Sequence, residues 1–144
     1  MSNENKIKIF LVDDDALFLK LLENEFVQHT EYSVETYLTG EQCLANLPYA
    51  PDIVILDYHL NGINKNAMNG MQTLDEIKTV NEAIPVVMLS SQDSIDVAVN
   101  CLHHHAFDYI VKSETAFIRL QKTIASIVLY KKMAGELSWY RKRM

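Results

Sequence analysis

The sequence has few of the residues that interrupt or cross-link a chain: its 144 residues include four glycines, three prolines and two cysteines. Cys43 and Cys101 lie far apart and form no CxxC pair, which disfavours a disulfide framework and predicts reduced, buried thiols. No apolar run reaches the roughly 18 residues that a membrane span requires. Residues 1–6 lack the apolar core of a secretion signal. We therefore expect a cytoplasmic protein that does not insert into a membrane.

Positive charge is also scarce. The chain has 13 Lys and Arg residues against 19 Asp and Glu, a formal net charge of −6. This balance leaves no broad basic surface to neutralise phosphates, so we expect no direct binding to nucleic acid. With 49% hydrophobic residues and no internal repeat, the chain is typical of one globular domain with a sizeable core.

The sequence does contain short apolar runs that each lead into a side chain able to do chemistry. Four runs share this property: 7–12 before Asp13, 53–56 before Asp57, 85–89 before Ser90 and 109–111 before Lys112. Such β-branched runs are typical of strands buried on both faces of a parallel sheet. Parallel strands end at one edge, and open α/β sheets bind ligands there. We therefore predict that these side chains meet at one site.

Segments with helical periodicity separate the apolar runs. Apolar residues recur at intervals of three and four, which predicts helices over 16–27, 40–47, 71–78 and 94–103 and from about residue 114 onward. Residues 32–38 alternate like a half-buried strand. Strands and helices thus alternate in five units, which predicts an α/β fold with a doubly wound parallel sheet and helices on both faces.

The acids at the first two of these strand ends indicate metal and phosphate chemistry. Asp13, Asp14 and Asp57 would repel one another at close range, which raises at least one pKa and favours a hard cation. Ligands made of oxygen alone favour Mg²⁺, with Mn²⁺ as the alternative. An aspartate beside such a cation is a competent nucleophile toward phosphorus. The Lys112 ammonium and the Ser90 hydroxyl could then bind the transferring oxygens.

With this joint pattern, residues from Lys6 to about Tyr130 resemble the receiver domain of a bacterial two-component response regulator, like the chemotaxis regulators. The resemblance implies a flavodoxin-like (βα)5 fold with strand order 2-1-3-4-5. It also implies a phosphoacceptor signalling domain rather than an enzyme, one that could take phosphate from small donors and release it again. The expected partners are a histidine kinase or phosphotransfer protein and a downstream protein.

The resemblance assigns a role to each residue of the acidic cluster. Asp57 matches the phosphoacceptor, and Asp13 and Asp14 match the acidic pair, with Asp14 as the direct metal ligand. The backbone carbonyl of His59 matches the third protein ligand of the metal. The His59 side chain is expected either to tune the loss of phosphate or simply to fill surface.

Further roles follow for the last two strand ends. Ser90 matches the hydroxyl residue that moves toward the phosphoryl group, and Tyr109 matches the aromatic residue that changes position with it. Lys112 matches the lysine that pairs with the phosphoryl group. Gln92 is expected, like His59, either to orient or block the attacking water or to have no such role.

The chain departs from the family pattern in three places. Asn61 stands where receivers usually have proline, and the matching glycine is Gly70, so the 61–69 loop is about five residues longer than usual. This loop either alters kinase selection or the rate of phosphate loss, or it is a tolerated surface insertion. His105 replaces the usual glycine before the last strand, and Ser113 replaces the proline after the lysine. None of these changes removes a catalytic group.

The C-terminal region allows two interpretations. We predict a receiver domain over residues 1–130 and a helical extension over 131–144, which is not a separate domain. The extension carries an apolar stripe of Tyr130, Met133, Leu137, Tyr140 and Met144. It is either a dimerising or docking helix or a frayed tail, and a homodimer could also form through the last two strand–helix units. The run 103–105 of three histidines is predicted to be a solvated helix end rather than a metal site.

Three other functions are weighed against the switch. An aspartyl-phosphate hydrolase of similar topology would use Asp57 or Asp13 as its nucleophile, but the chain has no room for the cap domain of that class. A degenerate receiver would act only as a protein-binding module. A flavin-binding carrier would need a phosphate-cradling loop after the first strand, where the aspartates would repel the phosphate.

Overall fold

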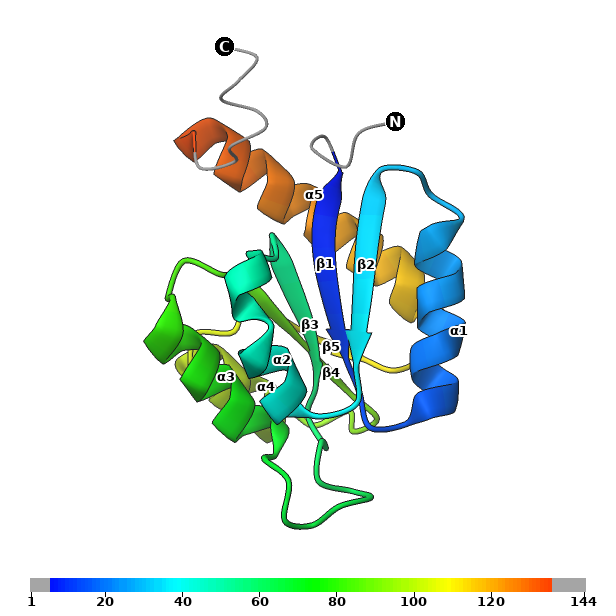
Figure 1. The fold of residues 1–144 in the computed structure, drawn as a ribbon, viewed down its shortest axis with the longest axis vertical. Helices are drawn as coiled ribbons and strands as arrows, with labels where there is room; N and C mark the ends of the chain where they lie inside the picture. Colours follow the sequence, from blue (N-terminus) through cyan, green and yellow to red (C-terminus); the bar gives the residue numbers. More distant parts are fainter. Residues whose placement is uncertain (1–5, 136–144) are drawn as a thin grey trace.

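The computed structural model describes residues 6–135, in which strands and helices alternate along the chain (Figure 1). The strands are β1 (Ile7–Val12), β2 (Tyr32–Tyr37), β3 (Ile53–Asp57), β4 (Val86–Ser90) and β5 (Asp108–Val111). The helices are α1 (Ala16–Val27), α2 (Gly40–Ala45), α3 (Gly70–Val80), α4 (Ile95–His103) and α5 (Ala116–Ala134), with a 3-10 turn η2 (Leu47–Tyr49). The predicted α/β alternation is confirmed.

The strands form one parallel sheet in the order β2-β1-β3-β4-β5, which confirms the flavodoxin-like topology. Helices α1 and α5 cover one face of the sheet, and α2, α3 and α4 cover the other. The register pairs Val12 with Leu56, Asp57 with Leu89 and Ser90 with Val111. This register brings the carboxyl ends of four neighbouring strands to one edge, the lower edge of the sheet in Figure 1.

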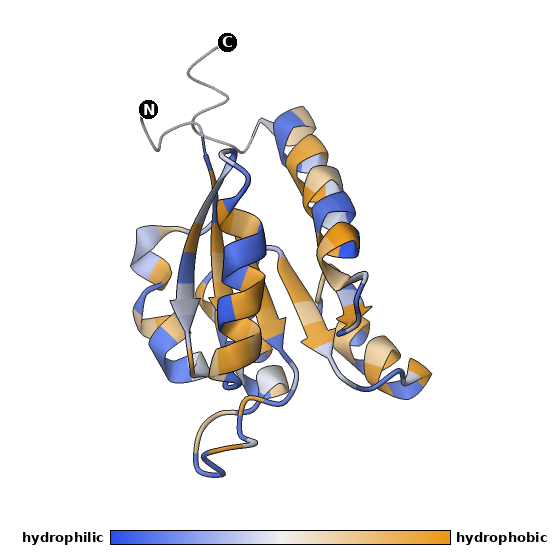
Figure 2. Ribbon diagram, turned by 90° about the vertical axis from the view of Figure 1, so that its right-hand side faces the viewer, coloured by the Kyte–Doolittle hydropathy of each residue, from blue (hydrophilic) through white to orange (hydrophobic). Residues whose placement is uncertain are grey.

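Alternate residues of each central strand pack into two separate cores. Ile9 and Ile55 face α1 and α5, whereas Phe10 and Leu56 face the other three helices. Strands β3 and β4 are buried along their whole length, as expected for strands covered on both faces. Figure 2 shows the result: the central strands are hydrophobic throughout, and the helices carry hydrophilic residues among hydrophobic ones. The two cores hold the strand ends rigidly in place.

Side-chain caps set the helix starts next to the functional edge. The Asp15 carboxylate accepts hydrogen bonds from the N–H groups of Leu17 and Phe18, which begins α1 directly after the acidic turn. A capping box between Asn69 and Gln72 begins α3. The helix predicted over 40–47 ends at Ala45 instead, and the chain then passes into the 3-10 turn η2. Pro48 in this turn has no backbone N–H, so it cannot donate the hydrogen bond that would continue the α-helix.

The three consecutive histidines lie at the end of α4. Only His103 is helical, His104 is the cap and pairs with Asp75 at 2.8 Å, and His103 and His105 are exposed. Within residues 6–135, the one group of three or more acidic, histidine or cysteine residues close enough to hold a metal ion is Asp13, Asp14 and Asp57. The structure thus agrees with the predicted solvated helix end.

His105 has a left-handed backbone conformation, with φ of 74°. A side chain is unfavourable there by roughly 1–2 kcal/mol, although glycine also gains entropy when unfolded. We predict that His105→Gly raises the free energy of unfolding by about 1 kcal/mol in urea denaturation. The control His103→Gly, at the last residue of α4, should not raise it and should lower it by less than about 1 kcal/mol. Equal changes at the two positions would contradict the conformational explanation.

Helix α5 continues through the predicted boundary at residue 130 and ends at Ala134, with Gly135 as a left-handed cap. Tyr130 and Met133 of the predicted apolar stripe are exposed. Leu137, Tyr140 and Met144 lie outside the described residues, so the helical extension and the domain boundary stay predictions. In the part of the chain that the structure describes, every helix is too short or too polar to cross a bilayer.

Candidate functional site

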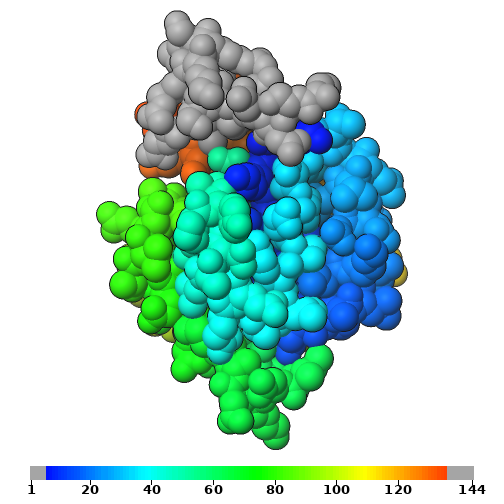
Figure 3. All heavy atoms as spheres, viewed as in Figure 1, coloured from blue at the N-terminus to red at the C-terminus, as the bar shows by residue number. Residues whose placement is uncertain are grey.

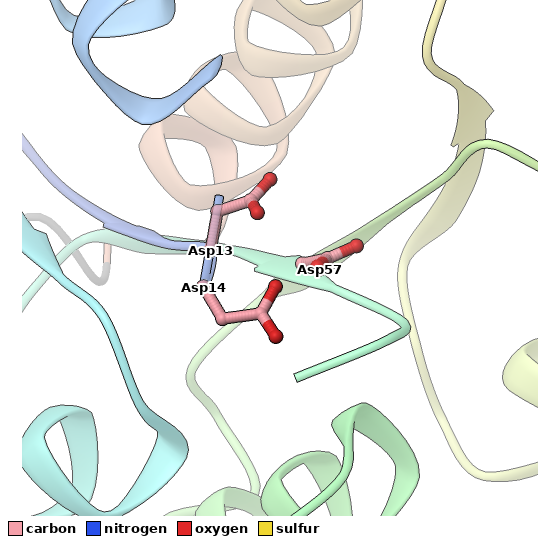
Figure 4. Close-up of side chains that lie close together, drawn as sticks. All are labelled: Asp13, Asp14 and Asp57. Atoms are coloured by element: carbon pink, nitrogen blue, oxygen red, sulfur yellow. The ribbon is translucent and has the colours of Figure 1, made fainter. Parts of the chain in front are cut away.

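Three aspartates from two strand ends meet at the carboxyl edge of the sheet (Figure 4). Asp13 and Asp14 follow β1, and Asp57 is the last residue of β3; one ligand atom from each lies within 4.8 Å of the others. Asp13 and Asp57 are each only 3% exposed. The predicted convergence of the acids is therefore present in the structure.

Asp57 is an unusually weak acid for an aspartate. Burial and, to a smaller extent, the charge of nearby Asp13 raise its pKa to about 7. The Lys112 ammonium and a hydrogen bond from the His59 backbone N–H act in the opposite direction but are outweighed. The carboxylate thus lies in a site where its negative charge is only partly compensated.

Lys112 reaches back from the end of β5 into this acidic cluster. Its Nζ lies 2.8 Å from Asp13 Oδ2, 3.3 Å from Asp57 Oδ1 and 4.4 Å from the centre of the Phe18 ring. Burial disfavours the ammonium, but the two carboxylates outweigh burial and raise the Lys112 pKa. The side chain therefore stays charged at neutral pH, and the ring of Phe18 adds a cation–π contact that fixes its position.

Asp14 is bound by the long loop that follows β3. Its Oδ2 accepts hydrogen bonds from the backbone N–H groups of Gly62 at 3.0 Å and Ile63 at 3.2 Å. A Cβ at Gly62 would lie 3.3 Å from Asp14 Oδ2 and 3.8 Å from the carbonyl oxygen of His59. The loop therefore lies directly against two of the predicted metal ligands, and it projects from the molecule at this edge (Figure 3).

The two predicted switch residues are linked through the backbone of Gln92. The buried Ser90 hydroxyl oxygen accepts a hydrogen bond from the Gln92 N–H at 3.0 Å. The Tyr109 hydroxyl donates to the Gln92 carbonyl oxygen. Ser90 and Tyr109 therefore share a hydrogen-bonding partner, the Gln92 backbone. The Gln92 residue is exposed, and its side-chain role in phosphate loss stays a prediction.

His59 is exposed, and its ring packs edge to face against the Tyr58 ring at 4.9 Å between centroids. The contact between His59 and the acidic cluster is made by the backbone: the His59 N–H donates a hydrogen bond to the Asp57 carboxylate. The predicted tuning role of the imidazole stays untested.

The donor set fits a hard divalent cation. All of the side-chain ligands are carboxylates. The carbonyl oxygen of His59 and the Asp14 carboxylate both lie next to Gly62. The buried Asp13 Oδ2 is paired with the Lys112 ammonium at 2.8 Å, so one ammonium faces the three carboxylates of the cluster. The excess negative charge that remains favours a bound cation.

Sequence reasoning missed two contributors to the site. Phe18 has the spacing of a core-facing helix residue, and nothing in that spacing indicates its contact with Lys112. The amides of Gly62 and Ile63 were missed because every residue except proline has a backbone N–H, so such donors leave no pattern in a sequence. The unusual length of the loop was the only available indication.

Comparison with known proteins agrees with this geometry. The family description "Response regulator receiver domain" matches residues 9–125. The chain is 31% identical over 130 residues to the transcriptional regulatory protein ZraR of Salmonella typhimurium, covering 90% of this chain and 28% of that protein. It is 33% identical over 116 residues to a protein-glutamate methylesterase/protein-glutamine glutaminase of Clostridium acetobutylicum, covering 78% and 32%. The chain thus spans less than a third of the length of either relative.

A solved structure shows the same architecture. The crystal structure of the receiver domain of NtrX from Brucella abortus has a TM-score of 0.67 and 29% identity, and the match covers 90% of this chain and 99% of that one.

Proposed function

Because the chain belongs to the family of response regulator receiver domains, we propose that it is a phosphorylation-dependent signalling switch. A histidine kinase or phosphotransfer protein would donate a phosphoryl group to Asp57. The observation that carries the proposal is the position of the Asp57 carboxylate, at the open edge of the sheet and within reach of two acids and one ammonium. The cytoplasmic location and bacterial origin expected from the sequence stay predictions.

Mg²⁺, or Mn²⁺, is the cation we propose for the cluster, held by Asp14, Asp13, Asp57 and the His59 carbonyl. When bound, it would supply the positive charge that lets a phosphate approach three carboxylates. An Asp57 oxygen would then form a bond to phosphorus as the bond to the donor's leaving group breaks. Lys112 would exchange its contact with Asp57 for a phosphoryl oxygen, and its pairing with Asp13 keeps the ammonium in place.

Ser90 would convert the phosphorylated site into a changed surface. Its hydroxyl would turn from the Gln92 N–H to a phosphoryl oxygen, and Tyr109 would follow through the Gln92 carbonyl. Reversing a population from 1:99 to 99:1 requires about 5.5 kcal/mol. Charged hydrogen bonds contribute roughly 1.5–3 kcal/mol each, so bonds from Ser90 and Lys112 to phosphoryl oxygens would supply part of this energy.

The output surface is proposed to lie over the last two strand–helix units, where Tyr109 sits. Apolar side chains are exposed there on α4 and before β5: Ile95, Val99, Leu102 and Phe107. A downstream protein or a second copy of the chain would bind this surface in the phosphorylated state. The activities named for the two long relatives are not assigned to this chain, which matches less than a third of their length.

A small phosphodonor such as acetyl phosphate, with Mg²⁺ and intact-mass detection, tests the proposal. We expect one added phosphoryl group per chain, which Asp57→Ala abolishes and the control Asp52→Asn, at the opposite edge of the sheet, leaves unchanged. Rapid multiple turnover of phosphate esters without an adduct would instead support the hydrolase. Absence of both adduct and turnover would support the degenerate receiver.

A further inference from the structure

The 61–69 loop projects from the molecule, and hydrogen bonds near its two ends anchor it to other elements. Within it, the Ala67 N–H donates to the Asn64 carbonyl at 3.0 Å, and the Asn66 N–H donates to the Asn64 side chain at 3.0 Å. The Met68 N–H donates to the Glu41 carboxylate of α2 at 3.0 Å. Together with the two bonds to Asp14, these contacts hold both arms of the loop. The bonds to Glu41 and Asp14 are the ones that tie the loop to other elements.

The loop engages only one of the two oxygens of Asp14. Both amides, from Gly62 and Ile63, donate to Oδ2. A carboxylate can accept hydrogen bonds on one oxygen and bind a cation with the other. Because both amides bind the same oxygen, Oδ1 accepts no bond from the loop and is available to a cation, and the two bonds restrict the rotation of the side chain.

We propose that the backbone amides of Gly62 and Ile63 are positioning groups for the metal site, so that closure of the 61–69 loop and binding of Mg²⁺ favour each other. The inference rests on the proposed Mg²⁺ site. The amides act through Asp14, whose partly exposed side chain accepts no other hydrogen bond within residues 6–135. Fixing this ligand in advance removes part of the entropy loss on metal binding. The lengthened loop thus holds the Asp14 side chain in place for metal binding.

The coupling predicts effects in two directions, because closure of the loop and binding of Mg²⁺ favour each other by the same factor. Loss of an outer-shell partner typically weakens metal binding about 10–100-fold. Removing one of the two amides should therefore weaken Mg²⁺ binding about tenfold. Saturating Mg²⁺ should in turn slow hydrogen exchange of the Gly62 and Ile63 amides about tenfold, since opening of the loop becomes that much rarer.

The test measures Mg²⁺ affinity by calorimetric titration of the metal-free protein with the metal alone. Ile63→Pro removes one donor to Asp14 at a position whose side chain is 76% exposed. Lys65→Pro is the matched control, because the Lys65 N–H donates no hydrogen bond within residues 6–135. We expect about tenfold weaker binding for Ile63→Pro and less than about twofold change for Lys65→Pro.

Hydrogen exchange of the unmodified protein, with and without Mg²⁺, keeps the test independent of how well the proline variant folds. Slower exchange at Gly62 and Ile63 on Mg²⁺ addition supports the proposal. Faster or unchanged exchange overturns it and indicates that the loop competes with the metal or ignores it. If the unmodified protein binds no Mg²⁺, both this proposal and the metal site of the proposed function are wrong. If it binds Mg²⁺ but exchange does not slow, only this proposal is wrong.

Discussion

Asp57→Asn is expected to make the protein more stable, by roughly 2–4 kcal/mol at about pH 8 without metal. The folded-state pKa of Asp57 is raised to about 7 by burial and by Asp13, from an ordinary value of 3.8. Above the folded-state pKa the folded protein must hold a buried charge that the unfolded chain holds in water. Asparagine has nearly the shape of the protonated acid and removes this penalty.

The sign of this effect gives it a pH dependence. The stability associated with protonated Asp57 is fully present below about pH 4 and is lost as the pH rises through about 7. The gain from Asp57→Asn should therefore vanish at about pH 4 and grow toward about pH 8. Urea denaturation across this range measures it. The control Asp15→Asn, at an exposed helix cap, should show no such growth; a pH-independent gain at Asp57 would contradict the assignment.

Gly70→Ala is expected to lower the free energy of unfolding by about 3 kcal/mol or more. A Cβ at this position would lie 2.4 Å from the carbonyl oxygen of Asp57 and 2.6 Å from that of Tyr58. The obstructing atoms are backbone, and the Gly70 N–H also donates to the Tyr58 carbonyl at 3.1 Å. Because a side-chain rotation cannot relieve the clash, either the start of α3 or the end of β3 must move.

Urea denaturation measures the effect of Gly70→Ala, and the adjacent cap provides its control. Asn69→Ala removes a capping side chain but adds no clash, and should lower the free energy of unfolding by only about 1 kcal/mol. If Gly70→Ala is no more destabilising than Asn69→Ala, the close approach of α3 to the phosphoacceptor strand is wrong. The Gly70 variant should also bind Mg²⁺ more weakly, because the displaced backbone carries Asp57 and leads to His59.

The sheet and the convergence of its polar strand ends could be predicted because both follow from short-range patterns. Buried β-branched runs identify the central strands, and parallel strands necessarily share a carboxyl edge. The positions of Asp13, Asp57 and Lys112 then need no further information. Helix ends were less predictable, as α2 shows, since a helix and a 3-10 turn require almost the same residues.

The contact between the 61–69 loop and Asp14, and the left-handed backbone of His105, could not be predicted from such short-range patterns. Asp14 and Gly62 are 48 residues apart, and their bond uses a backbone N–H that any residue but proline could supply. His105 occupies a left-handed position where glycine would be the expected residue. The conformation of the loop depends on anchors from α2 and from the turn after β1, so only the folded structure reveals that the insertion touches Asp14.

The central claim is that Asp57 accepts the phosphoryl group. The most direct measurement treats the protein with acetyl phosphate and Mg²⁺, reduces the product with borohydride, and sequences the peptides by mass spectrometry. Reduction of an aspartyl phosphate leaves homoserine, which we predict at position 57 and at no other aspartate. Homoserine at Asp13 or Asp14, or its absence from the whole chain, would contradict the account.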